Sequence, residues 1–297
     1  MLNQITKKQQ VFTLKVAPQI TDRKIDNWLD FHYVAINNSR PPINKLFLFL
    51  PGSFGLPARH SLILETAANL GCHAINLSYP NSWTVGTLCQ RSKNPDCHQL
   101  VRKEIIDGLT LTGKFTIGRA NSIINRLVKL LLYLNEKYPQ QGWLQYLEGE
   151  YPKWESIIVA GHSQGGGHAA IIAQENLVAR VIMLGAPADY SPVLNGPAPW
   201  LSAPHITPND RYYGFVHLQD EGFENIKEAW DLLGLQGEMV NIDHHFPPLN
   251  NSRRLVTQTP VTRKQYHGSV VTDGPTPKQS DGTPVFTRIW QYLITTL

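Results

Sequence analysis

The chain has 297 residues, of which 42% are hydrophobic and 17% charged, and its formal net charge is +4. This length is near the upper end of what one hydrophobic core sustains, and no Pro/Gly/Ser-rich linker, charge run or internal repeat divides it. We therefore expect a single domain over residues 1–297. The lysines and arginines do not cluster with aromatic residues, which argues against a nucleic-acid partner, and no apolar run approaches a membrane span.

The first ten residues, Met1–Gln10, lack the apolar stretch of a signal peptide, so we expect a cytoplasmic location by default. Three cysteines are too few for a disulfide-built fold. Cys72 lies in a predicted strand and is expected to be a small buried residue. Cys89 and Cys97 flank a polar loop that a disulfide could close, but a reducing cytoplasm favours two free thiols.

Apolar runs bounded by turn residues predict early strands, and helices and strands then alternate. The predicted strands are Gln10–Val16, Phe31–Ile36, Lys45–Leu50, Cys72–Leu77, Ser156–Ala160, Val181–Gly185 and Gly214–Leu218. The predicted helices are Pro57–Leu70, His98–Leu109, Ala120–Tyr138, Gly165–Glu175 and Val285–Thr295. Continuous runs such as Ile157–Val159 are typical of parallel strands covered on both faces. The sequence predicts an α/β fold with a mostly parallel central sheet and helices on both faces.

Ser163 lies in Gly161-His162-Ser163-Gln164-Gly165, a G-x-S-x-G motif between an apolar strand and a small-residue helix start. This context is that of a nucleophile elbow, a sharp turn that holds a serine hydroxyl clear of the sheet. Glycines two residues away on either side are needed because the backbones come too close for a Cβ. We therefore predict Ser163 as the nucleophile, against the alternative of a glycine-lined turn with an incidental serine.

A serine nucleophile needs a base and an acid, which in folds with such an elbow follow in the order serine, acid, histidine. The strand that ends at Leu218 is followed by Asp220, our choice for the acid. Asp189, after the preceding strand, and Glu221 remain as alternatives.

His267 is the predicted base, because it lies beyond the acid in a loop before the last helix. Imidazole titrates near neutral pH and can take the serine proton and return it to the leaving group. His244 and His245 compete for this role, although they fit a polar strand end and lack the i, i+4 spacing of a helical zinc site. We expect neither a metal nor a cofactor.

The oxyanion formed during acyl transfer needs hydrogen-bond donors. One is expected from the backbone N–H of Gln164, directly after the nucleophile. The other is expected from the N–H of Ser53, in the glycine turn Pro51-Gly52-Ser53 after a buried strand. Many hydrolases have His-Gly at this turn, and Pro51 replaces that histidine here.

Four motifs in this order resemble the α/β-hydrolase superfamily: Pro51-Gly52-Ser53, Gly161–Gly165, Asp220 and His267. More narrowly, Gly161–Ala170 and the later Tyr213–His217 strand resemble a poorly characterised bacterial and fungal group of esterase- and lipase-like proteins. The resemblance covers most of the chain from Lys45 onward. It implies a serine hydrolase that cleaves a carboxylic ester of a small molecule through an acyl-enzyme, with thioesterase, amidase and acyltransferase as alternatives.

Two hypotheses from other functional classes stay open. The glycines after the elbow formally match G-x-G-x-x-A of dinucleotide-binding folds, with Asp189 as the ribose-binding acid, but the elbow separates them from the strand. The other hypothesis is a protein with a hydrolase fold that binds a ligand without catalysing its turnover. The oligomeric state stays open.

We expect the segment from about residue 80 to 118 to be an insertion that covers the site. The irregular stretch Asp189–Asp210 could form a second wall. The aromatic residues expected to line the site are Trp83, Phe54, Trp200 and Tyr190, and few charges accompany them. The expected substrate is therefore an uncharged ester with a short to medium acyl chain.

Overall fold

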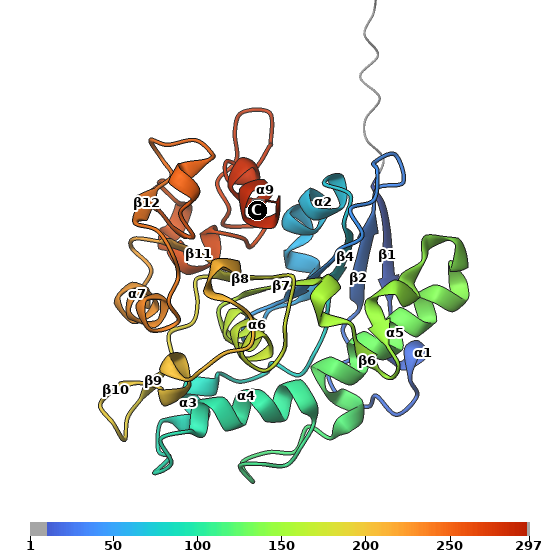
Figure 1. The fold of residues 1–297 in the computed structure, drawn as a ribbon, viewed down its shortest axis with the longest axis horizontal. Coiled ribbons are helices and arrows are strands. Elements are labelled where there is room, and N and C mark those ends of the chain that lie inside the picture. The colour runs from blue at the N-terminus through green and yellow to red at the C-terminus, as the bar shows by residue number, and fades with distance from the viewer. Residues whose placement is uncertain (1–10, 296–297) are drawn as a thin grey trace, which may run out of the picture.

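The computed structural model describes residues 11–295, so the predicted absence of a signal peptide in Met1–Gln10 lies outside the described residues. Its main sheet has nine strands in the order β1-β2-β4-β3-β7-β8-β11-β13-β12 (Figure 1). The strands are β1 (Phe12–Val16), β2 (His32–Ile36), β3 (Leu46–Leu50), β4 (His73–Asn76), β7 (Ile157–His162), β8 (Arg180–Leu184), β11 (Tyr212–His217), β12 (Met239–Asn241) and β13 (Arg254–Thr257). The β1–β2 and β2–β4 pairs are antiparallel and the other pairs are parallel, as the sequence predicts.

The helices are α1 (Pro18–Thr21), α2 (Ser61–Asn69), α3 (Val85–Cys89), α4 (Cys97–Asp107), α5 (Ile123–Lys137), α6 (Gln164–Glu175), α7 (Phe223–Leu232), α8 (Tyr266–Ser269) and α9 (Thr287–Thr295). The five predicted helices correspond to α2, α4, α5, α6 and α9 to within a few residues, except that Pro57–Arg59 forms a 3-10 turn before α2. Two-stranded ribbons are formed by β5 (Leu147–Glu148) with β6 (Tyr151–Pro152) and by β9 (Tyr190–Ser191) with β10 (Gly196–Pro197). The sequence patterns missed α1, α3, α7, α8, β12, β13 and the two ribbons.

Side chains that alternate along each central strand supply two separate apolar layers. In β3, Phe47 and Phe49 pack with α2 and α9 on one face of the sheet, whereas Leu46, Leu48 and Leu50 pack with α4, α5 and α6 on the other. Figure 1 shows α2 and α9 on one side of the sheet and α4 and α6 on the opposite side. Burial on both faces explains why the central strands are continuous apolar runs.

The segment around 80–118 contains α3 and α4, which pack against each other, and α4 also packs against α5 and α6. Cys89 at the end of α3 and Cys97 at the start of α4 form a disulfide, so the expectation of two free thiols is wrong for this structure. Both sulfurs are buried among apolar residues, and the short turn brings the helix ends together. Cys72 is buried and free, as expected.

The carboxyl ends of the parallel strands place the predicted site residues along one edge of the sheet. Pro51 follows β3, Ser163 follows β7, Asp189 comes after β8, and Asp220 comes after β11. In open α/β sheets this edge is where ligands bind. Within residues 11–295, no helix combines the length and apolarity needed to cross a membrane.

Candidate active site

Ser163 connects β7 to α6 through a backbone with φ 53° and ψ −120°. A non-glycine residue with such a positive φ stores about 1–3 kcal/mol of strain, and such strain persists only where the surroundings enforce it. Here the Ser163 N–H donates to the Leu184 carbonyl at 2.9 Å, and the Gly166 N–H donates to the Ser163 carbonyl at 3.0 Å. A Cβ on Gly161 would lie 2.2 Å from the carbonyl carbon of Gly165, which confirms the predicted need for glycine.

Asp220 and His267 meet beside this turn. Asp220 has a 2% exposed side chain, and its Oδ1 accepts from the Gly222 N–H at 2.9 Å. His267 Nδ1–H donates to Asp220 Oδ2 at 2.7 Å, which leaves Nε2 unprotonated in the neutral ring. His267 belongs to the short helix α8 rather than to the predicted loop, and its side chain is 45% exposed.

The two alternative acids lie in different surroundings. Asp189 accepts from Arg102 Nε at 2.8 Å and Arg102 Nη2 at 2.6 Å, and also from Trp200 Nε1 at 3.0 Å. Burial raises the pKa of Asp189, but the Arg102 charge and hydrogen bonds outweigh it and hold that pKa at about 2. Glu221 is exposed to solvent. Only Asp220 of the three carboxylates contacts His267 within the described chain.

His162, the residue before the serine, was not predicted to have a role. Its ring centroid lies 4.7 Å from that of His267, and its Nε2–H donates to the His267 backbone carbonyl at 2.9 Å. Burial, with smaller contributions from His267 and His60, lowers the pKa of His162 well below its usual range, so the ring is neutral. The second residue of the motif, His162, therefore anchors the backbone of the candidate base.

Ser53 and Gln164 lie next to each other beside Ser163. Ser53 Oγ donates to Gln164 Oε1 at 2.9 Å, and neither residue's backbone N–H donates to another group within residues 11–295. Asn81 Nδ2 donates to the Gly52 carbonyl at 2.7 Å and so orients the Gly52–Ser53 peptide. A trans peptide directs its N–H opposite its carbonyl, so Asn81 also fixes the direction of the Ser53 N–H.

A pocket of about 1170 Å³ opens over these residues, and its lining includes Ser53, Ser163, Gln164, Asp220 and His267. Segments from the insertion and from the chain around α8 complete its walls: Thr84, Val85, Gly86, His98, Arg102, Lys264, Gln265, Tyr266 and Thr272.

The four aromatic walls expected from sequence do not line this pocket in the described chain. Trp200 is buried, where it donates to Asp189. Trp83 packs against Phe115, and Phe54 is 60% exposed. These aromatic residues therefore pack against other side chains or lie on the surface.

The other sequence candidates lie elsewhere. His244 and His245 are exposed after β12, and His245 Nδ1–H donates to the Asn241 carbonyl at 2.8 Å. No group of three or more potential metal-ligating side chains was found among residues 11–295. The glycines of the formal dinucleotide pattern lie inside α6, after the elbow turn, and Asp189 is paired with Arg102.

No family model and no curated protein matches this sequence. Among solved structures, a putative dienelactone hydrolase from Klebsiella pneumoniae is 11% identical, with coverage of 96% of this chain and 98% of that one and a TM-score of 0.41. A bacterial heroin esterase is 15% identical, with 96% and 85% coverage and a TM-score of 0.43. An esterase of the bacterial hormone-sensitive lipase family is 13% identical, with 96% and 84% coverage and a TM-score of 0.44. The strand order, the six consecutive parallel pairs and the strained serine between β7 and α6 identify the fold of this chain as an α/β-hydrolase fold.

Proposed function

We propose that this protein is a serine hydrolase that cleaves a carboxylic ester through an acyl-enzyme. The observation that carries the proposal is the Asp220–His267 hydrogen bond beside the strained Ser163, with all three residues lining one pocket. A serine hydroxyl is a weak nucleophile unless a base takes its proton, and a carboxylate on the far ring nitrogen fixes the tautomer that can do so.

In the proposed mechanism, Ser163 Oγ attacks the ester carbonyl carbon while His267 Nε2 takes the hydroxyl proton. Asp220 stabilises the resulting imidazolium through the Nδ1–H bond. The negative charge that forms on the carbonyl oxygen is stabilised by the N–H groups of Gln164 and Ser53, which lack protein acceptors in the described chain. His267 then gives its proton to the leaving alkoxide, and the same residues activate water to hydrolyse the acyl-enzyme.

The proposed substrate is a small, uncharged ester with a short to medium acyl chain. Of the arginines and lysines that line the pocket, Arg102 is paired with Asp189, while Arg59 and Lys264 are exposed to solvent. No buried cation without a partner was found in the described lining to neutralise an anionic substrate. The volume of about 1170 Å³ accommodates a small molecule but does not select an acyl length.

The proposed activity is tested with nitrophenyl esters of increasing acyl length, together with a thioester and an anilide of the preferred acyl group. We expect the highest kcat/KM for an oxygen ester, and no turnover by Ser163→Ala. A steep rise in rate only above the solubility limit would indicate a lipase. Preference for the thioester or anilide over every oxygen ester would contradict the ester assignment, and absence of turnover and of serine labelling would favour a non-catalytic binding protein.

A further inference from the structure

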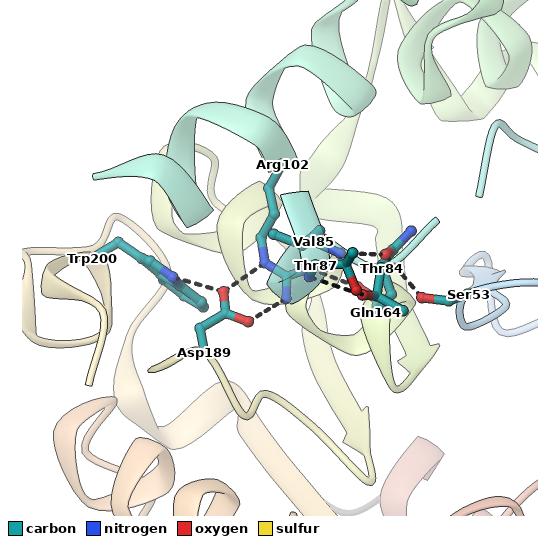
Figure 2. Close-up of polar contacts among 8 residues, drawn as sticks. All are labelled: Ser53, Thr84, Val85, Thr87, Arg102, Gln164, Asp189 and Trp200. Atoms are coloured by element: carbon teal, nitrogen blue, oxygen red, sulfur yellow. Dashed lines mark hydrogen bonds and ion pairs between the residues drawn. The ribbon is translucent and has the colours of Figure 1, made fainter. Parts of the chain in front are cut away.

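One buried side chain connects the two candidate oxyanion donors. Gln164 Oε1 accepts from Ser53 Oγ at 2.9 Å and from the Val85 backbone N–H at 3.1 Å (Figure 2). A backbone N–H can only donate, so the Val85 contact fixes which end of the Gln164 amide is the oxygen. Gln164 is 5% exposed, and its side chain therefore fixes Ser53 and the first residue of α3 relative to the elbow.

The backbone of Gln164 is held from the opposite direction by Arg102 of α4. Arg102 is 3% exposed, and its Nη1 donates to the Gln164 carbonyl at 2.8 Å while Nε and Nη2 bind the two oxygens of Asp189. Figure 2 shows this chain of contacts running from Trp200 through Asp189 and Arg102 to Gln164. Gln164, whose N–H is proposed to bind the oxyanion, is consequently restrained at its side chain and at its carbonyl.

The third glycine of α6 fits this arrangement. A Cβ on Gly167 would lie 2.3 Å from Arg102 Cζ and 2.4 Å from its Nη1. The elbow requires Gly161 and Gly165, but it does not require glycine at 167. Because Gly167 has no side chain, the Arg102 guanidinium can pack against α6.

A buried ion pair is weak evidence for a contribution to stability, because desolvation of two charges offsets their attraction. Arg102 uses its third nitrogen, Nη1, to bind the carbonyl of an oxyanion-hole residue, which a role in stability alone does not explain. We infer that Arg102, oriented by Asp189, is a positioning residue that fixes the oxyanion hole from the insertion. This inference rests on the proposed hydrolase function and explains what the insertion does for the reaction.

The Arg102→Lys variant keeps a positive charge for Asp189 but loses the planar donors that reach Asp189 and Gln164 together. We expect kcat for the best nitrophenyl ester to fall about 10- to 100-fold, approaching the effect of removing an oxyanion donor. KM should stay within about twofold, and the pH dependence of kcat/KM should keep its midpoint, because Asp220 and His267 are unchanged. Lys103→Gln is the matched control: this neighbouring residue pairs with Glu175 and should leave both constants unaltered.

Two further variants keep the test independent of folding defects. Arg102→Met/Asp189→Asn removes both buried charges and leaves an acceptor for Trp200 Nε1, so it should fold and should show the same loss in kcat. Gly167→Ala should displace the guanidinium and lower kcat with every triad residue present. Circular dichroism and the unfolding midpoint verify that each variant is folded.

Phosphonylation by a fluorophosphonate separates this inference from the ester assignment, because labelling needs the activated serine and the hole but no ester turnover. If the wild type is labelled but hydrolyses no ester, the ester assignment fails, and a slower labelling rate in Arg102→Lys still supports the positioning role. Folded variants that keep kcat and labelling rates within about twofold of wild type, or that lose activity only through KM, would overturn it. A wild-type protein that neither labels nor turns over would overturn both proposals.

Discussion

At the scale of single residues, the proposed chemistry depends on which carboxylate orients His267. Asp220 is buried against the imidazole, whereas Asp189 is oriented by a guanidinium and an indole. The two acids follow neighbouring parallel strands, so sequence order alone could not separate them. The difference arises from Arg102, which lies 87 positions from Asp189 in the sequence.

We predict that Asp220→Asn lowers kcat about 10⁴-fold, because an amide in place of the carboxylate favours the wrong imidazole tautomer. Steady-state kinetics with the preferred ester measures the effect, and Glu224→Gln at the exposed start of α7 serves as the control. An Asp220→Asn variant within tenfold of wild type would remove Asp220 from the proposed triad.

The elbow was the most predictable part of the site because its determinants are contiguous. A buried strand, a strained serine and flanking glycines all occur within residues 157–167. His162 and Asn81 were missed for the opposite reason, since each acts on a residue that is distant in sequence or in another loop. Catalytic roles for Ser163, Asp220, His267, Ser53 and Gln164 stay predictions until they are measured.

At the scale of elements, the disulfide joins the two helices that contact the elbow. Val85 begins α3 and Arg102 lies in α4, while Cys89 and Cys97 connect the helix ends between them. The sequence showed that a bridge could form but favoured free thiols from an assumed reducing compartment. Amino-acid composition does not identify the redox compartment, so it could not decide between a disulfide and two free thiols.

We predict that Cys89→Ser/Cys97→Ser lowers the free energy of unfolding by about 2–3 kcal/mol, the value for closing a short loop of this length in the unfolded chain. Urea denaturation of both proteins with and without reductant measures it, and reductant should affect only the wild type. Mass spectrometry of non-reduced peptides provides the direct check: two free thiols in protein handled without reductant would refute the bond.

The elements missed from sequence were short or polar. In β13, Arg254–Thr257, only Leu255 and Val256 are apolar, so the run falls below the length that predicts a strand. The strand nonetheless forms because β11 and β12 supply hydrogen-bonding partners on both sides. Pairing with neighbouring strands determines whether such segments form strands, and the local residue pattern does not specify that pairing.

At the scale of the whole molecule, several buried histidines link stability to pH. Burial lowers the pKa of His60 and of His73 to about 4, and it lowers the pKa values of His32, His162 and His168 well below their usual range. In the unfolded chain these rings titrate near pH 6.5. Below that pH the unfolded state binds more protons than the folded state, so the stability present above pH 6.5 is lost as the pH falls towards 4.

We predict that the free energy of unfolding declines continuously from pH 7 to pH 4.5. The folding equilibrium constant should fall up to about tenfold per pH unit for each histidine that stays neutral in the fold. Urea denaturation at a series of pH values measures this slope, and replacing the exposed His244 by Gln should leave it unchanged. A flat profile over this range would mean that the buried rings accept protons without unfolding.

The class of fold was predictable because the central strands are long apolar runs that alternate with amphipathic helices, and the structure confirms the predicted α/β-hydrolase arrangement. The insertion around 80–118 contributes to the pocket wall as predicted, but the side chains that line the pocket were not predictable, since none of the four expected aromatic residues is among them in the described chain. Loop geometry depends on contacts between distant segments, and local residue patterns do not specify them.

The proposed function requires that Ser163 is a nucleophile activated by His267. The most direct test is incubation of the folded protein with a fluorophosphonate, followed by intact-mass measurement and peptide mapping. We predict one adduct on Ser163, and loss of labelling in Ser163→Ala and in His267→Ala. Modification of a different serine while Ser163 stays free, or undiminished labelling of His267→Ala, would contradict these roles of Ser163 and His267.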